Sequence, residues 1–180
     1  MIGVLVSGEG TNLQALLDAG LPIAAVASNN TKAKALDRAV AAGIEAAAFP
    51  ETEFESREAR DTAMADFLEE RGVNLVVCAG YMRLLTKQFL ERFPGRIVNT
   101  HSAPLPEFPG KTPIEDVLAA GVPETAATVH YVDGGVDTGA VIAAERVPVH
   151  PGDTADSLRE RVQAVEHRLL PAAVRTLCER

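Results

Sequence analysis

The sequence is poor in aromatic residues and in cysteine. It contains no tryptophan, two cysteines among 180 residues and only 4% aromatic residues. Cys78 and Cys178 have neither CxxC spacing nor other metal ligands beside them, which argues against a disulfide framework and against a metal site. Reduced thiols are typical of intracellular proteins, so we expect a cytoplasmic protein without a bound metal.

Long apolar runs and an excess of basic residues are missing too. No stretch approaches the length of a membrane-spanning helix, and the opening MIGVLVSGEG lacks the basic region of a signal peptide. The 17 Lys and Arg residues are outnumbered by 25 Asp and Glu residues, which gives a formal net charge of -8. This charge disfavours nucleic-acid and membrane partners, although backbone N–H groups can still hold a small anion. With 47% hydrophobic residues, we expect a single globular domain over residues 1–180.

What the chain does contain is an alternation of short β-branched runs and longer alanine-rich stretches. The expected strands cover residues 2–6, 23–28, 75–79, 97–99 and 127–132. The expected helices between the early strands cover residues 12–19, 32–42 and 57–71. Near-continuous apolar strands that alternate with helices predict an α/β fold, a three-layer doubly wound sheet that is mostly parallel.

The chain after residue 123 predicts a different arrangement. Residues 124–149, ETAATVHYVDGGVDTGAVIAAERVPV, contain two strand-like runs joined by a glycine-rich turn. At least one strand towards the C-terminus should therefore be antiparallel to the rest. The final stretch predicts an amphipathic helix capped by Asp153 or Thr154, and Pro171 should kink or break it.

Two glycines, Gly8 and Gly10, stand between the first expected strand and the first expected helix. A tight turn there would leave the first N–H groups of the helix free to bind a phosphate. Leu13 stands where a dinucleotide fingerprint has its third glycine, and the second strand ends in ASNN without an acidic residue. A phosphate site is therefore favoured over a dinucleotide site. The alternative is a plain turn with Thr11 or Asn12 as the helix cap.

Asn99 and His101 end a strand in the segment RIVNTHSAPLP. Side chains two residues apart lie on one face of a strand, here at the carboxyl end where open α/β sheets bind ligands. An amide and a protonated imidazole aimed at one oxygen would stabilise the oxyanion of an acyl transfer. A carboxylate would keep the imidazole charged, and VDGGVDTGAV offers Asp137 as the preferred partner and Asp133 as its competitor.

The remaining histidines predict no further site. His130, His150 and His167 stand apart from one another, and neither a Ser-His-Asp order nor a Cys-His pattern suggests an enzyme nucleophile. The attacking atom should therefore belong to the substrate.

Six segments occur in the order and spacing of a known family. They are SGEGTNLQALL, FESREARD, VVCAGYMRLLT, RIVNTHSAPLPEFPG, TVHYVDGGVDTGAVI and RVQAVEHRLLP, and the likeness extends over residues 1–177. The chain thus resembles the phosphoribosylglycinamide formyltransferases, folate-dependent enzymes of purine biosynthesis. The resemblance implies a Rossmann-like formyltransferase fold. It also implies transfer of a formyl group from 10-formyltetrahydrofolate to the primary amine of N1-(5-phospho-D-ribosyl)glycinamide (glycinamide ribonucleotide).

The resemblance also implies roles for individual residues. The catalytic residues would be Asn99, His101 and Asp137. The ribonucleotide and its phosphate would be bound by Gly10, Thr11, Asn12, Gln163 and Glu166. The folate would be bound by Arg57, Met82, Arg83, Leu84, Leu85, Asn99, Asp133, Gly134, Gly135, Val136 and Asp137. Without the resemblance, Met82, Leu84 and Leu85 would be assigned to the core. Arg57 would be assigned to a solvated helix and Glu166 to the surface.

The chain departs from the family beside its histidine. The family usually has His-Pro-Ser-Leu-Leu-Pro, whereas this chain has HSAPLP, so Ser102 stands in place of a proline. The segment GKTPIEDVL also lacks a histidine that often follows its glycine. The bond Leu105-Pro106 matches one that is often cis. Because the amide, the imidazole and the carboxylate are kept, we expect the chemistry to be kept.

Two other functions remain open. One is formyl transfer to another amine, such as an amino sugar or a charged tRNA, although tRNA would favour a basic appended domain. The other is a non-catalytic module that binds a nucleotide or folate. The expected partners are small molecules only, with no nucleic acid and no membrane, and the chain is either a monomer or a homodimer.

Overall fold

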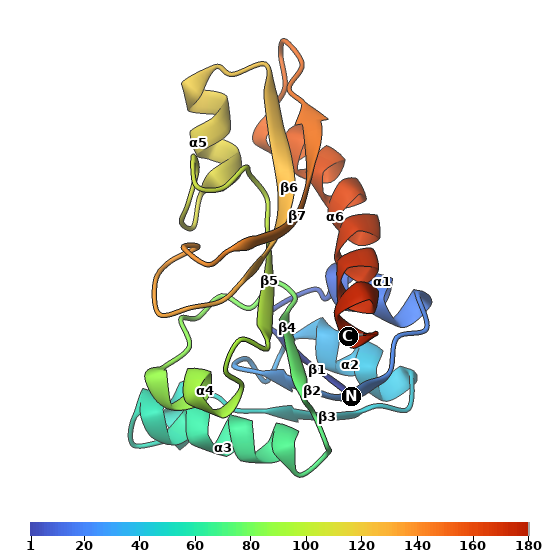
Figure 1. Cartoon of the computed structure of the whole chain (residues 1–180), viewed down its shortest axis with the longest axis vertical. Coiled ribbons are helices and arrows are strands. Elements are labelled where there is room, and N and C mark those ends of the chain that lie inside the picture. Colours follow the sequence, from blue (N-terminus) through green and yellow to red (C-terminus); the bar gives the residue numbers. More distant parts are fainter. Residues whose placement is uncertain (180) are drawn as a thin grey trace.

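The computed structural model describes residues 1–179 and arranges them around a seven-stranded sheet in the order β3-β2-β1-β4-β5-β6-β7 (Figure 1). The strands are β1 (Ile2–Val6), β2 (Ile23–Ser28), β3 (Glu45–Ala48), β4 (Leu75–Cys78), β5 (Ile97–His101), β6 (Glu124–Tyr131) and β7 (Val141–Pro148). The first five run parallel to one another, whereas β6 is antiparallel to both β5 and β7. The predicted doubly wound sheet with antiparallel pairing near the C-terminus is confirmed.

Helices cover both faces of this sheet. They are α1 (Thr11–Asp18), α2 (Lys34–Ala41), α3 (Arg57–Glu69), α4 (Lys87–Arg92), α5 (Pro113–Ala120) and α6 (Ala155–Cys178), with a short 3₁₀ turn at Glu51–Glu53. One face packs against α1, α2 and the C-terminal part of α6, and the other packs against α3 and α4 (Figure 1). A third apolar cluster joins α5 and the N-terminal part of α6 to β6 and β7. These three layers are the predicted ones.

The order of the strands positions the functional end of the sheet. The chain builds β1, β2 and β3 outward in one direction and then returns to place β4 on the other side of β1. The carboxyl ends of β1, β4 and β5 consequently lie next to one another. In open α/β sheets, ligands bind at such a reversal of strand order.

Local sequence explains where two of the helices begin. The Ser56 side chain caps α3 by accepting the Ala59 N–H at 3.0 Å. Thr154 caps α6 in a reciprocal box with Ser157, which settles the choice between the two expected caps. Asp153 instead accepts hydrogen bonds from both terminal nitrogens of Arg161.

Some expectations about secondary structure were wrong or incomplete. The helix α6 runs through Pro171 without a break. Leu170, just before the proline, and Val174, after it, are both buried in the core and hold the helix there. The strand β3 and the helices α4 and α5 were not predicted.

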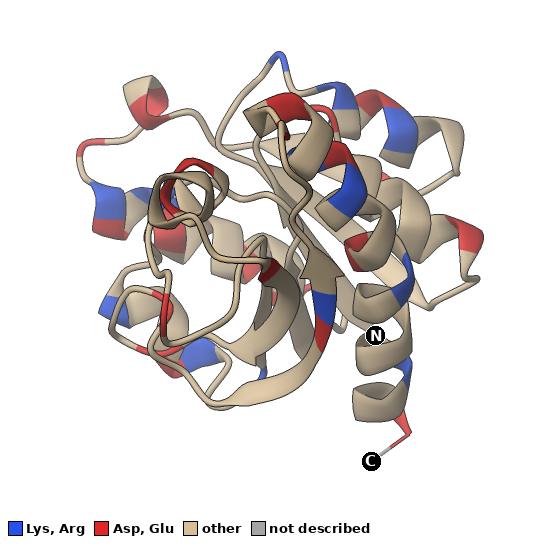
Figure 2. Ribbon diagram, turned by 90° about the horizontal axis from the view of Figure 1, so that it is seen from above, with Lys and Arg blue, Asp and Glu red and all other residues tan. Residues whose placement is uncertain are grey.

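Basic and acidic residues are interspersed along the outer helices (Figure 2). Within residues 1–179, no helix combines the length and the apolar character needed to cross a membrane.

Candidate active site

The turn from β1 to α1 requires glycine at position 10. Gly10 has φ 75°, and a Cβ there would lie 2.6 Å from the Ala35 Cβ. Gly10 is also the N-cap of α1, and it provides no capping side chain. The alternative in which Thr11 or Asn12 caps the helix was wrong, since both lie inside its first turn. The N–H groups of this turn are thus left without a capping side chain.

Two of the three predicted catalytic side chains, His101 and Asp137, approach each other at the carboxyl end of β5, the strand that also carries Asn99. The Nδ1 of buried His101 lies 3.6 Å from the Asp137 Oδ2, a close approach of charge rather than a hydrogen bond. The Nε2 of His101 donates to the Phe108 carbonyl oxygen at 2.6 Å. Both ring nitrogens therefore face protein acceptors, an arrangement that a doubly protonated imidazole can satisfy.

The Asp137 carboxylate accepts one backbone hydrogen bond and lies beside two histidine rings. Burial opposes its ionisation, but His130, the Gly110 N–H and His101 together hold the pKa of Asp137 below its ordinary value. The Gly110 N–H donates to its Oδ2 at 2.9 Å. Asp137 also has φ 53°, a backbone conformation that costs a residue with a side chain about 1 kcal/mol. The loop thus holds a strained residue with its carboxylate charged.

Asp133, the competing carboxylate, does not reach the imidazole. Its Oδ1 accepts from the Thr138 hydroxyl at 2.6 Å and from the Gly135 N–H at 2.9 Å. These two bonds lower the pKa of Asp133, and the residue is exposed. Asp133 therefore closes the 133–138 turn, and the choice of Asp137 agrees with the geometry.

His130 belongs to the same cluster, although the sequence analysis assigned it no site. It pairs with Asn99 across β5 and β6, and its Nε2 lies 3.3 Å from the Asn99 Nδ2 and 3.5 Å from the Asp137 Oδ1. The Nδ1 of His130 donates to the Tyr131 carbonyl at 2.8 Å, so Nε2 faces Asp137 as a donor in a protonated ring and accepts one Asn99 hydrogen in the neutral ring. The second amide hydrogen of Asn99 is then left for a ligand. Sequence reasoning missed His130 because the β5–β6 register is not visible in the sequence.

Glu166 is buried, although the sequence alone would place it on the surface. It is 3% exposed on α6 and accepts from the Ser102 hydroxyl at 2.7 Å and from the Asn12 amide at 3.2 Å. It thereby links α1, the end of β5 and α6. Gln163, half-buried, precedes Glu166 by three residues and so lies on the same side of the helix.

The segment after β4 carries apolar side chains that do not belong to the core. Met82 is 60% exposed and Leu84 is 55% exposed, whereas Leu85 packs against the core cluster under α3 and α4. Arg57, at the start of α3, donates to the Leu84 carbonyl at 2.9 Å, and Arg83 pairs with Glu51 at 3.0 Å. The core assignment thus holds for Leu85 only, and the other two could contact a flat apolar ligand.

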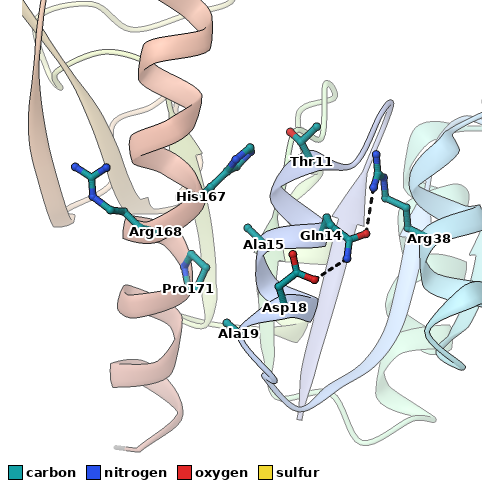
Figure 3. Close-up of a pocket in the computed structure, with 9 residues that line it drawn as sticks. All are labelled: Thr11, Gln14, Ala15, Asp18, Ala19, Arg38, His167, Arg168 and Pro171. Atoms are coloured by element: carbon teal, nitrogen blue, oxygen red, sulfur yellow. Dashed lines mark hydrogen bonds between the residues drawn. The ribbon is translucent and has the colours of Figure 1, made fainter.

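Two hollows lie near these residues. The smaller, about 340 Å³, is lined by Asp137 and by apolar residues that include Leu105, Pro106 and the 46% exposed Val136. The bond Leu105-Pro106 is cis, as predicted. The larger, about 620 Å³, lies between α1 and α6 and shares only Thr11 with the predicted phosphate turn (Figure 3). The catalytic residues predicted here do not line the larger hollow.

The cluster combines groups that are chemically suited to polarising a carbonyl. Asn99 is an amide donor, and the His101 ring lies 3.6 Å from the Asp137 carboxylate. Within residues 1–179, no group of three or more His, Cys, Asp and Glu residues could hold a metal ion.

Comparisons with known proteins agree with the resemblance seen in the six segments. The sequence profile of a family described as "Formyl transferase" matches residues 1–174. The Mycobacterium tuberculosis (strain H37Rv) protein named phosphoribosylglycinamide formyltransferase is 44% identical over 178 residues, which cover 97% of this chain and 83% of that protein. The trifunctional purine biosynthetic protein adenosine-3 of Bos taurus is 41% identical over 179 residues, and the match covers 96% of this chain but only 18% of that protein.

A solved structure gives the same result. Glycinamide ribonucleotide transformylase 1 from Symbiobacterium toebii superposes with a TM-score of 0.97 at 44% sequence identity. The match covers 99% of this chain and 87% of that structure. The likeness therefore includes the whole sheet and the loops at its carboxyl edge.

Proposed function

Because this chain belongs to the formyl transferase family, we propose that it transfers the formyl group of 10-formyltetrahydrofolate to the primary amine of glycinamide ribonucleotide in purine biosynthesis. One observation carries the proposal: His101 lies 3.6 Å from Asp137, beside Asn99, at the carboxyl end of β5. This trio suits direct acyl transfer, because it polarises a carbonyl without supplying a nucleophile.

The proposed reaction begins when the lone pair of the substrate amine attacks the formyl carbon. The carbonyl electrons move to oxygen, which receives the free amide hydrogen of Asn99 and the field of the His101 imidazolium. Collapse of this tetrahedral centre breaks the bond to the folate nitrogen. The amine loses one proton and the departing nitrogen gains one, with a water as relay. Because Nε2 of His101 already donates to the Phe108 carbonyl, its main contribution is electrostatic.

Binding would place the two substrates on either side of this trio. The turn at Gly10, Thr11 and Asn12 would hold the ribonucleotide phosphate with its N–H groups, and Gln163 and Glu166 would face the glycinamide end. Exposed Met82 and Leu84, with Leu85, Arg57 and Arg83 around them, would receive the folate, and the 133–137 loop would cover its pterin ring. Holding both reactants in line supplies much of the remaining rate enhancement.

Turnover of the purified protein tests the proposal. Formyl-folate is mixed with glycinamide ribonucleotide, or in parallel with an amino sugar, and deformylation of the folate is followed. We expect acceleration with the ribonucleotide alone. Folate binding without turnover would instead identify a non-catalytic module, and turnover with the amino sugar would identify another acceptor.

Substitutions in the trio test the proposed mechanism. Asp137→Asn keeps the size of the side chain and, like Asp, tolerates the positive φ, so its effect reports the lost charge. We expect Asp137→Asn and His101→Ala each to lower kcat by about 100-fold or more with folding preserved. The matched controls are Asp156→Asn and His150→Ala, both at exposed positions, which should leave kcat unchanged. A near-normal rate in either trio variant would remove that residue from the mechanism.

We further propose that residues 1–180 form one formyltransferase domain that acts in the cytoplasm. Support comes from the match over residues 1–174 and from Cys78 and Cys178, which are both free thiols.

A further inference from the structure

Glu166 has an unusual environment for a buried carboxylate. Its side chain is 3% exposed, and its two oxygens accept from one hydroxyl, that of Ser102, and one amide, that of Asn12. In the described part of the chain, no lysine, arginine or histidine pairs with it. Both donors are neutral, so they stabilise the carboxylate without cancelling its charge.

The two donors also fix the orientation of the carboxylate. A glutamate side chain loses rotamer entropy when it is immobilised. Ser102 holds Oε1 at 2.7 Å and Asn12 holds Oε2 at 3.2 Å, so this ordering is complete before any ligand arrives. The shorter of the two bonds is the one from Ser102.

The position of Ser102 links this carboxylate to the reacting centre. Ser102 directly follows His101, while Glu166 lies 64 residues later on α6. The adjacent loop is itself tied down, because the buried Thr128 hydroxyl donates to the Ala103 carbonyl at 2.8 Å. Because the Ser102 hydroxyl is carried on this rigid segment, it fixes the position of the Glu166 carboxylate relative to the His101 ring.

We propose that Ser102 is a positioning residue that orients Glu166 toward the amine of the acceptor substrate. This inference rests on the proposed function, since it assumes that the acceptor presents an amine to Glu166. Ser102 gives its single hydrogen to the carboxylate, and Glu166 offers its remaining lone pairs to the amine hydrogens. The folate side of the site does not involve this bond.

The test measures both KM values in Ser102→Ala and Ser102→Thr. Hydrogen bonds to charged groups are among the stronger ones, so Ser102→Ala should raise the KM for glycinamide ribonucleotide about tenfold. The KM for formyl-folate should stay within about twofold of the wild-type value, because the bond lies on the acceptor side. Ser102→Thr keeps a hydroxyl and should restore most of the acceptor KM.

A double-mutant cycle separates positioning from a merely structural role. In a Glu166→Gln background, Ser102→Ala should add little, because the charged group that it orients is already gone. The matched control is Thr112→Ala, which removes a hydroxyl that bonds the exposed Asp116 carboxylate at 3.2 Å, and it should leave both KM values unchanged. Additive effects in the cycle, equal changes in both KM values, or an unchanged acceptor KM in Ser102→Ala would each overturn the inference.

The outcome also stays readable if the proposed function fails. A wild-type protein that binds glycinamide ribonucleotide without turnover would end the proposed activity but leave the Ser102 bond testable by calorimetry on the same variants. A tenfold weaker Kd in Ser102→Ala would then support the role. A wild-type protein that does not bind the ribonucleotide would overturn both.

Discussion

Two regions of this protein bury a carboxylate, and they treat it in opposite ways. Asp61, on α3, is fully buried and accepts two hydrogen bonds from the equally buried Arg60, at 3.0 and 2.7 Å. Glu166, on α6, is also buried but receives only neutral donors. The first charge is neutralised within the protein, whereas no cation within residues 1–179 pairs with the second.

The surroundings of the two carboxylates match this difference. The second oxygen of Asp61 accepts the Thr86 N–H at 2.7 Å, and Arg60 also reaches Glu51, so this pair ties α3 to its neighbouring segments. Glu166 instead lies at the carboxyl edge of the sheet, one residue from the end of β5 through its bond to Ser102. The Asp61 carboxylate is thus part of a structural ion pair, whereas we propose that the Glu166 carboxylate serves a ligand.

The largest expected effect comes from breaking the neutralised pair. Arg60→Ala leaves Asp61 buried without a counter-charge, so we expect the free energy of unfolding to fall by about 3–5 kcal/mol. Urea denaturation of the purified protein measures this loss. The control is Arg92→Ala on α4, whose ion pairs with Asp66 and Glu69 lie at the surface and should matter much less. Equal losses in the two variants would mean that burial does not set the strength of the Arg60 pair.

Glu166→Gln tests the other side of the comparison. The change removes a charge that no protein cation neutralises, so we expect little or no loss of stability. The kcat/KM for glycinamide ribonucleotide should nevertheless fall by roughly 10- to 100-fold, because an amide attracts the amine less than a carboxylate does. Steady-state kinetics and thermal melting on one preparation measure the two effects together.

The control for Glu166→Gln lies on the same helix. Glu160 is exposed, and Glu160→Gln should change neither the melting temperature nor the kinetics. If Glu166→Gln destabilises the protein as strongly as Arg60→Ala does, the carboxylate is structural and the distinction between the two regions disappears.

The sequence predicts the parallel half of the sheet well because its signal is local. The buried runs at β1, β2 and β4 are apolar except for Ser28 at the end of β2, and their strands lie within a residue of the expected bounds. By contrast, β3 has the sequence EAAA, which contains no β-branched residue. Its strand conformation comes from pairing with β2, a contact between distant parts of the chain that propensity does not reveal.

The candidate site shows the same division between local and distant signals. Asn99 and His101 could be placed on one face of a strand because their spacing is local. The approach of His130 to Asn99 depends on the register of β5 against β6, and the burial of Glu166 depends on how α6 packs over the end of β5. The resemblance identified Ser102 as a departure from the family, because it stands in place of a proline. Its hydrogen bond to Glu166, however, could be found only from the three-dimensional structure.

The smallest change in the free energy of unfolding is expected for an ion pair that involves an exposed carboxylate. Glu124 pairs with Arg146 at 2.6 Å across β6 and β7, but the two side chains are 50% and 84% exposed. Water screens such a pair and both side chains lose rotamer freedom in forming it, so Arg146→Gln should change the free energy of unfolding by less than about 1 kcal/mol. Denaturation at low and at high salt measures the difference, which should shrink further as salt is added. A loss approaching that of Arg60→Ala would show that an arginine partner, rather than the removal of water, determines how strongly a carboxylate holds this fold together.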